Sequence, residues 1–190
     1  MPTAPLLQPY RFTTAQYEHL FVAGILPPGA RVELLKGALI EMAPIGGPHI
    51  VCVVRLDRLL QNGLGEAAVV SVQNPVDVAD GDVPQPDIAV LRPPLETYER
   101  RRPSAADVLL LIEVSDTTLA RDRDVKGPLY AANAIPEYWI ADLAHGALLV
   151  YREPVQGRYH SVQVLRRGAA IRPLAWPDAE LAVVAILGSE

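Results

Sequence analysis

The run DVLLLIEV at residues 107–114 constrains the fold more than any other segment of the chain. A strand that is apolar at almost every position must be covered on both faces, which is typical of the centre of a sheet flanked by helices. Glu113 lies within this run, where an ionised carboxylate is costly unless it is paired or bound to a metal ion. The run therefore predicts a central buried strand that carries a polar group near its end.

The remaining pattern predicts helices mixed with strands. Helices are expected after Thr13 or Thr14, after Gly46 and around residues 129–132. Residues 1–10 are expected to be a loose lead-in, and residues 92–103 a polar loop. Helices and strands sharing one core in 190 residues predict one α/β domain, residues 1–190, built on a mixed sheet. The expected strands cover residues 31–35, 38–42, 68–72, 87–91, 107–114, 137–141, 147–152 and 159–164.

Composition narrows the class of protein. Half of the residues are hydrophobic, which describes a folded globular chain. The net charge of -5 argues against indiscriminate DNA binding through a global positive field, although it leaves a local basic groove possible. Three groups of cationic residues could form such a groove: Arg100–Arg102; Arg121, Arg123 and Lys126; Arg166 and Arg167. For Arg100–Arg102 a solvated surface is the more common role.

Cysteine use and hydropathy bear on the compartment. The single cysteine, Cys52, lies among valines, so simple burial is expected, and no disulfide can form within the chain. No basic segment followed by an apolar one resembles a signal peptide, and no apolar run is long enough to span a membrane. These features predict a cytoplasmic protein without a membrane partner.

Two carboxylates and a lysine form the candidate site. Asp87 follows Pro86 at the start of an apolar strand, and Glu113 stands near the end of the central strand. Either carboxylate alone would more often be structural, but two that mark neighbouring strands favour a shared site. Carboxylate oxygens are the ligands of Mg²⁺ or Mn²⁺, and Lys126 could assist an attacking water. The set is typical of a metal-dependent phosphodiester hydrolase.

The placement of Lys126 depends on a helix that contains a proline. Asp122, Lys126 and Tyr130 are four residues apart and would share one helix face. A surface ion pair between Asp122 and Lys126 is the alternative. Pro128 would kink the helix or make it begin again at that point.

Three further residues are weaker candidates. Glu33, on the expected hairpin strand, is equally well explained as a site carboxylate or an exposed charge. His49 in the first turn of a helix could be a ligand, a proton carrier or a phosphate contact, although a capping or core histidine is more common. Gln85 precedes Pro86-Asp87 and could hydrogen-bond a metal-bound water or a ligand.

The chain resembles the PD-(D/E)XK nuclease superfamily and, within it, the Uma-two family of restriction-endonuclease-like proteins, also catalogued as a domain of unknown function. The resemblance covers most of residues 10–165. It rests on VELLKGALIEM (32–42), the helix with His49, VQNPV (72–76), PQPDIAVLRP (84–93), LLLIEVSDTTLARDRDVKGPLYAANAIPEYWIAD (109–142) and the Val150-Tyr151-Arg152 hairpin.

The resemblance implies a restriction-endonuclease-like fold, a mixed sheet flanked by helices with extra hairpins. It also implies catalytic roles for Glu33, Asp87, Glu113 and Lys126, with Mg²⁺ or Mn²⁺ held by the three carboxylates. The superfamily lysine normally stands where this chain has Ser115, so the resemblance implies that the lysine has migrated to Lys126. Residues around the metal or touching phosphate would be His49, Gln85, Ser115, Asp122 and Tyr130.

Three functions remain open at this point. The first is a metal-dependent endonuclease that hydrolyses DNA, acting as a homodimer. The second is a catalytically weak or inactive nucleic-acid-binding or assembly module of the same fold, which the acidic charge favours. The third, a hydrolase of small phosphates, is weakened because the chain has no glycine-rich phosphate loop and no histidine cluster. Residues 181–187 or the exposed hairpins are candidate dimer surfaces.

Overall fold

The computed structural model describes residues 8–189, and its centre is a six-stranded mixed sheet. The strand order is β3-β4-β5-β6-β7-β8, and every neighbouring pair is antiparallel except β5 and β6, which are parallel. The expected central strand is therefore confirmed, because β5 has a strand on both sides. The six strands are β3 (Val69–Val72), β4 (Ile88–Leu91), β5 (Val108–Ser115), β6 (Glu137–Asp142), β7 (Ala147–Val155) and β8 (Arg158–Arg166).

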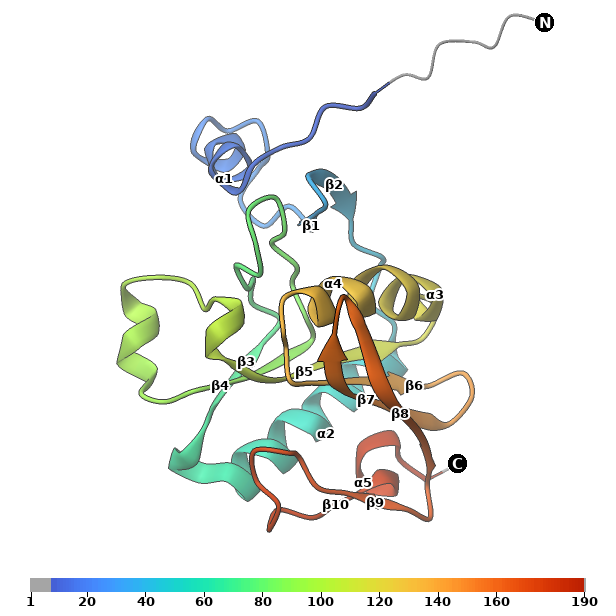
Figure 1. The fold of residues 1–190 in the computed structure, drawn as a ribbon. Helices are drawn as coiled ribbons and strands as arrows, with labels where there is room; N and C mark the ends of the chain where they lie inside the picture. Colours follow the sequence, from blue (N-terminus) through green and yellow to red (C-terminus); the bar gives the residue numbers. More distant parts are fainter. Residues whose placement is uncertain (1–7, 190) are drawn as a thin grey trace, which may run out of the picture.

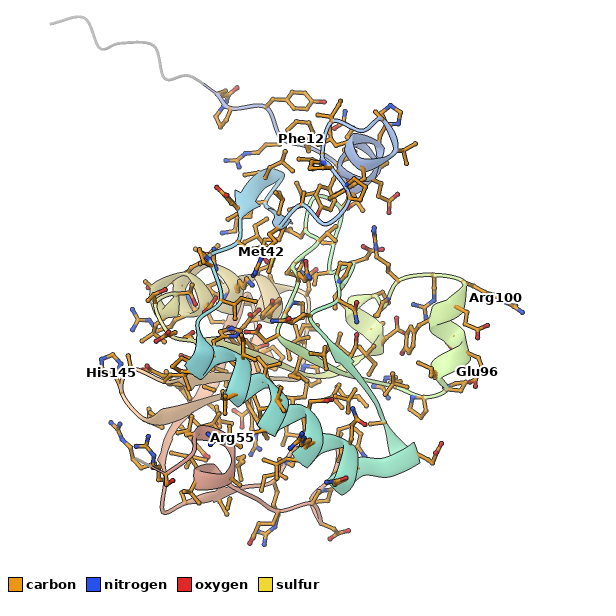
Figure 2. The ribbon with its side chains drawn as sticks, turned by 180° about the vertical axis from the view of Figure 1, so that it is seen from behind. Phe12, Met42, Arg55, Glu96, Arg100 and His145 are labelled. Atoms are coloured by element: carbon orange, nitrogen blue, oxygen red, sulfur yellow. The ribbon has the colours of Figure 1, made fainter. Side chains whose placement is uncertain are left out.

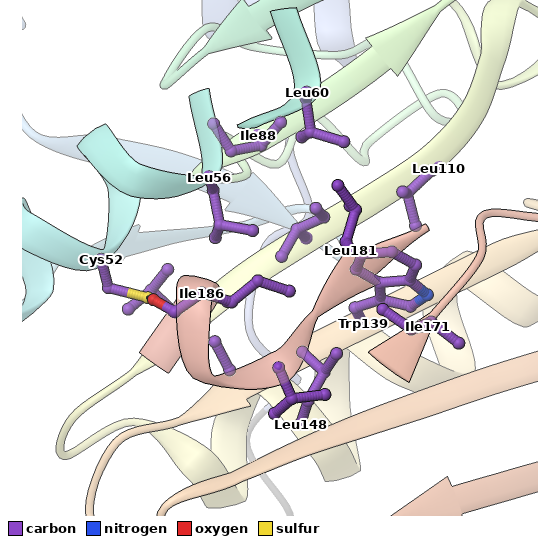
Figure 3. Close-up of a cluster of buried hydrophobic side chains, with 14 of the residues drawn as sticks. Cys52, Leu56, Leu60, Ile88, Leu110, Trp139, Leu148, Ile171, Leu181 and Ile186 are labelled. Carbon is purple, nitrogen blue, oxygen red and sulfur yellow. The ribbon is translucent and has the colours of Figure 1, made fainter. Parts of the chain in front are cut away.

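One face of the sheet packs against the long helix α2 (Gly47–Leu64) and the C-terminal helix α5 (Val183–Leu187), as Figure 1 shows. Alternate residues of β5 point to this face because side chains of a strand alternate. Figure 3 shows the resulting core, to which Trp139 and Leu110 of the sheet and Ile186 of α5 all contribute. The two-stranded sheet of β9 (Ala170–Ile171) and β10 (Leu181–Ala182) closes the same side.

The opposite face of the sheet carries a short, irregular helical segment. It runs through α3 (Leu119–Arg121), a single π-helical stretch (Asp122–Lys126) and α4 (Gly127–Ala132). Leu111, Tyr138 and Ile140 of the sheet pack there with Leu129 and Tyr130. Both faces of β5 are thus covered. The backbone stays helical from Arg121 into α4, and the helix changes from π to α at Gly127-Pro128 rather than stopping there.

The N-terminal residues form a smaller layer above one end of the sheet (Figure 1). Helix α1 (Thr14–Val22) begins with a capping box made by Thr13 and Gln16. The hairpin of β1 (Val32–Leu35) and β2 (Ala38–Glu41) pairs with the chain at Val83 through Leu34, and this pairing brings the hairpin to the sheet. Tyr17, Leu34 and Val83 form its core.

The expected strands agree with the observed ones within about three residues, and the loop expected at 92–103 is a connection without strand or α-helix. It contains a 3₁₀ helix, Leu95–Glu99, and shorter 3₁₀ turns occur at Gly65–Ala67 and Ala105–Asp107. Arg101 and Arg102 of this segment are paired with carboxylates rather than simply solvated. Residues 8–10 have no regular structure, and residues 1–7 of the expected lead-in lie outside the described residues.

The described residues contain no helix both long and apolar enough to cross a membrane. The apolar C-terminal segment is used inside the protein, since Leu181, Val183 and Ile186 all belong to the core under α2. These side chains are therefore not available as a dimer surface.

Cys52 is expected to be unreactive in the folded protein. Its thiol is buried beside the Ile186 carbonyl, and burial raises the pKa of Cys52 to about 12. An unfolded cysteine loses its proton near pH 8.5, so the free energy of unfolding should fall as the pH rises above about 8.5. Ellman's reagent should modify the native protein at about pH 8 far more slowly than the protein in concentrated guanidinium. Equal rates would contradict the buried placement.

Candidate functional site

Asp87 and Glu113 line one cavity of about 290 Å³ at an end of the central sheet. Asp87 directly precedes β4, and Glu113 is near the end of β5. Because β4 and β5 are antiparallel with Ile88 opposite Ile112, the start of one strand lies beside the end of the other. The sheet register therefore brings together two carboxylates that are 26 positions apart in the sequence. The other lining residues are Arg31, Met42, Ala43, Pro44, Ile45, Gly46, His49, Gln85, Val114, Asp116, Thr117, Thr118, Arg121, Asp122 and Lys126.

Asp87 is held in one orientation by three neighbouring groups. Its Oδ2 accepts the Val114 N–H at 2.8 Å and lies 3.1 Å from His49 Nε2, and its Oδ1 accepts Gln73 Nε2 at 3.0 Å. Burial alone would raise the pKa of Asp87, but these hydrogen bonds and the nearby His49 outweigh burial and lower it. Asp87 is therefore a charged carboxylate, fixed in the cavity wall.

Glu113 and Lys126 form a buried network with Glu33 and Tyr130. Lys126 Nζ lies 3.0 Å from Glu113 Oε1 and 3.0 Å from Glu33 Oε2, and Tyr130 donates its hydroxyl to Glu113 Oε1 at 2.8 Å. All four side chains are almost fully buried. A surface ion pair of Lys126 with Asp122 is therefore wrong; the lysine joins two other carboxylates inside the protein.

The charges of this network shift one another's pKa values. Burial raises the pKa of Glu113 to about 8, against the attraction of Lys126. Burial by itself would lower the pKa of Lys126, but the negative charges of Glu113 and Glu33 outweigh it and raise the pKa. Lys126 is thus an ammonium ion. The negative charges of Asp122, Asp87 and Glu33, which add to the rise in the pKa of Glu113, would also favour another cation beside it.

The π-helical turn explains how Lys126 reaches the site. Asp122 Oδ2 accepts the hydroxyls of Ser115 and Thr118, both at 2.6 Å, and the Asp122 carbonyl accepts the Tyr138 hydroxyl at 3.0 Å. These bonds fix the start of the wide turn at the end of β5. Lys126 at the end of the turn then points at Glu113, and π-helical turns are frequent at functional sites.

The structure brings the predicted residues together, although in different positions relative to the cavity. Glu33 is buried behind Lys126 and is not among the lining residues; besides the lysine, it accepts the Gln85 N–H. Tyr130 and Ser115 are fully buried; Tyr130 donates its hydroxyl to Glu113, and Ser115 donates its hydroxyl to Asp122. His49, Gln85 and Asp122 line the cavity, with the nearest contacts of His49 made to Asp87. The contribution of Glu33 to a metal site stays a prediction.

Gln73 is a site residue that sequence reasoning missed. It follows β3 in a left-handed conformation with φ of 51°, which is costly for a residue other than glycine and is often found at functional sites. Its side chain donates to Asp87, its backbone N–H donates to the Asp87 carbonyl, and its carbonyl accepts Gln85 Nε2. The signal in the sequence was the turn Gln73-Asn74-Pro75, which indicates a loop without giving it a role.

Asparagine at position 73 should test this positioning role. Asn tolerates the left-handed conformation but is one methylene too short to reach Asp87. Loss of a group that orients a metal ligand typically lowers metal affinity by about 10- to 100-fold. We therefore expect Gln73→Asn to weaken Mn²⁺ binding by about tenfold in calorimetry, with the melting temperature almost unchanged. Unaltered affinity would limit Gln73 to shaping the loop.

The donor set fits a divalent cation that keeps most of its water ligands. Within residues 8–189 no three carboxylate, histidine or cysteine side chains converge closely enough to form a ready-made cage. Asp87 and Glu113 nevertheless face one cavity, and Glu113 receives its hydrogen bonds on Oε1, which leaves Oε2 for another partner. Mg²⁺ is commonly bound by one or two carboxylates and several waters. Such an ion suits this pair.

A mixed sheet between helices, with an acidic cavity at the end of its central strands, defines a restriction-endonuclease-like protein. A family model described as "Putative restriction endonuclease" (Uma2) matches residues 14–184, and the chain belongs to this family. A solved "putative nuclease belonging to DUF820" from Anabaena variabilis ATCC 29413 is similar, with a TM-score of 0.69. The identity is 15% over 93% of this chain and 97% of that chain, so this likeness shows the fold. No curated protein matches the chain.

Proposed function

We propose that this nuclease-family chain is a metal-dependent endonuclease that hydrolyses phosphodiester bonds of DNA. The observation that carries the proposal is the convergence of Asp87, Glu113 and Lys126 on one cavity from three separate elements. Two carboxylates and an ammonium group are the protein groups that such a reaction needs. Their burial in a hydrogen-bonded wall pre-organises them for it.

Asp87 and Glu113 are the proposed ligands of Mg²⁺ or Mn²⁺. Asp87 is oriented by Gln73 and the Val114 N–H, and Glu113 by Lys126 and Tyr130, so neither carboxylate has to be reordered on binding. When bound, the ion supplies an acidified water and neutralises charge at the phosphate.

Lys126 is the proposed partner of the reacting water or phosphate oxygen. Its ammonium lines the cavity and stays protonated because Glu113 and Glu33 raise its pKa. A fixed positive charge in a buried site stabilises negative charge that develops during the reaction. Glu33 holds this charge from behind and keeps it aimed at Glu113.

Plasmid nicking with Mg²⁺ or Mn²⁺, run beside Mn²⁺ calorimetry, tests the proposal. We expect Mn²⁺ binding and conversion of supercoiled plasmid to open circles, both abolished by EDTA. Mn²⁺ binding without nicking would favour the nucleic-acid-binding or assembly module instead. If the protein showed no Mn²⁺ binding and no nicking, the proposed metal site would be overturned and only the family fold would remain.

We also propose that the protein acts as a cytoplasmic homodimer. The exposed Val155, Val162 and Val164 of the β7–β8 hairpin are the proposed surface, because most of the apolar side chains of residues 181–187 pack into the core. Sedimentation velocity should report a dimer for the wild type and a monomer for Val162→Glu with Val164→Glu. A monomeric wild type would contradict this expectation.

A further inference from the structure

Two arginines stand in the wall of the candidate nuclease cavity without a close carboxylate partner. Arg31 precedes β1, and Arg121 ends α3, so they approach from different parts of the chain. The Nη2 of Arg31 donates to the Ala43 carbonyl at 3.3 Å, and the Nη1 of Arg121 donates to the Glu41 carbonyl at 3.5 Å. Both contacts are long for hydrogen bonds.

Arg121 also has a buried donor with no acceptor. Its Nε makes no hydrogen bond and lies 4.0 Å from Asp122 Oδ1, whose other oxygen is used by Ser115 and Thr118. A buried donor without an acceptor costs about 1–3 kcal/mol, which favours any arrangement that gives the Arg121 guanidinium an acceptor. Arg123, two residues on, differs: it pairs with Asp124 through Nε and Nη2 at the surface.

The two carbonyls that the arginines contact are close in the sequence: Glu41 ends β2, and Ala43 lies in the connection that follows. Residues 42–46 link β2 to α2 and form part of the cavity wall, and Figure 2 shows Met42 between the N-terminal layer and the sheet. Carbonyls are neutral acceptors, whereas a phosphate accepts charge-assisted hydrogen bonds that are shorter and roughly twice as strong. Arginine presents a planar pair of donors that matches two phosphate oxygens.

We propose that Arg31 and Arg121 bind a backbone phosphate of the DNA strand next to the bond that Asp87 and Glu113 act on. The inference rests on the proposed function and names the residues that would hold the substrate. On binding, the arginines exchange the Ala43 and Glu41 carbonyls for phosphate oxygens. The protein needs such a local site because its net charge of -5 supplies no general attraction for DNA.

Asp116 adds a negative charge to a cavity that Asp87, Glu113 and Asp122 also line. It is exposed, lines the cavity and has no salt-bridge partner among the described residues. Its carboxylate repels a phosphate, so the phosphate should lie on the side of the two arginines. Replacing Asp116 by asparagine removes this repulsion and should tighten DNA binding.

Fluorescence anisotropy with a short labelled DNA duplex tests the proposal in EDTA, where neither metal binding nor cleavage contributes. The variants are Arg31→Gln with Arg121→Gln, Asp116→Asn, and Arg123→Gln as the matched control on the same segment. Loss of the contacts to this phosphate should weaken binding by about tenfold or more and reduce the salt slope by about one. Arg123→Gln should bind like the wild type, and Asp116→Asn more tightly.

The outcomes separate this inference from the proposed activity. Arginine-dependent binding by a protein that never nicks plasmid would support the phosphate site and contradict the endonuclease. Nicking with an unchanged KM and salt slope in the double variant would contradict the phosphate site and keep the endonuclease. A wild type that does not bind the duplex would overturn the inference. Matching melting temperatures for the variants would exclude misfolding as the cause.

Discussion

Replacing Asp87 by asparagine should abolish cleavage while the protein stays folded. The amide cannot supply the negative charge that a hard cation needs, so Mn²⁺ binding should become undetectable in calorimetry. We expect nicking to fall by about 1,000-fold or more, which corresponds to about 4 kcal/mol of lost transition-state stabilisation. The asparagine oxygen can still accept the Val114 N–H that now bonds to Asp87 Oδ2.

The choice of asparagine matters because alanine would do two things at once. Asp87→Ala leaves the buried Val114 N–H and the Gln73 side chain without an acceptor, and each lost partner costs about 1–3 kcal/mol. Asp142→Asn is the matched control, since Asp142 is also a buried carboxylate at a strand end but does not line the cavity. It should bind Mn²⁺ and nick plasmid as the wild type does. Equal loss in both variants would mean that folding, not the site, was affected.

The central part of the site could be predicted because it depends on strands. The apolar run around Glu113 has only one plausible place, inside a sheet, and Asp87 begins the next most apolar strand. Once two such strands pair antiparallel, their carboxylates must lie close together. Predicting this part of the site therefore required only knowing which segments are strands and which strands are neighbours. Hydrophobic runs indicate both well.

The positions of Lys126 and Gln73 in the site depend on local geometry that leaves no hydrophobic pattern in the sequence. Whether Lys126 is buried is decided by the π-helical turn, which in turn depends on Ser115 and Thr118 bonding to Asp122. Regular α-helical spacing could only suggest that Asp122 and Lys126 share a face. Gln73 acts through an unusual backbone conformation, and an uncharged side chain in a turn gives no signal of that.

Glu33 shows the limit of reasoning from residue type. A carboxylate on a hairpin strand between apolar residues was equally consistent with the site and with the surface. Pairing of Leu34 with Val83 folds the hairpin onto the sheet, and Glu33 thereby becomes buried against Lys126. Such long-range contacts depend on tertiary packing, which a local pattern does not contain.

Replacing Lys126 by methionine should strongly destabilise the protein in the absence of metal. The change leaves Glu33 and Glu113 buried without their shared cation, and removing one partner from a buried ion pair typically costs about 3–5 kcal/mol. For a chain of this size that loss should lower the melting temperature by roughly 10 °C. Thermal unfolding followed by circular dichroism measures the effect.

The defect should depend on pH in a defined direction. Burial already raises the pKa of Glu113 to about 8, and loss of Lys126 removes the attraction that opposes this rise. An unfolded glutamate has a pKa near 4.3, so the folded variant holds a proton that the unfolded chain releases. The folded wild type also holds this proton up to about pH 8, so the gap in stability should be nearly constant below pH 8 and widen above it, where the wild-type Glu113 ionises beside Lys126 and the variant keeps its proton. A defect that grows on acidification would contradict a buried carboxylate pair.

Restoring neutrality gives the decisive comparison. Lys126→Met with Glu33→Gln and Glu113→Gln removes all three charges, and a neutral replacement of a buried ion network is often no less stable than the original. The triple variant should regain most of the lost melting temperature, yet it should neither bind Mn²⁺ nor nick plasmid. Stability without activity would show that evolution keeps the buried charges for chemistry. A triple variant as unstable as Lys126→Met would instead assign the loss to the packing of the lysine side chain against its neighbours.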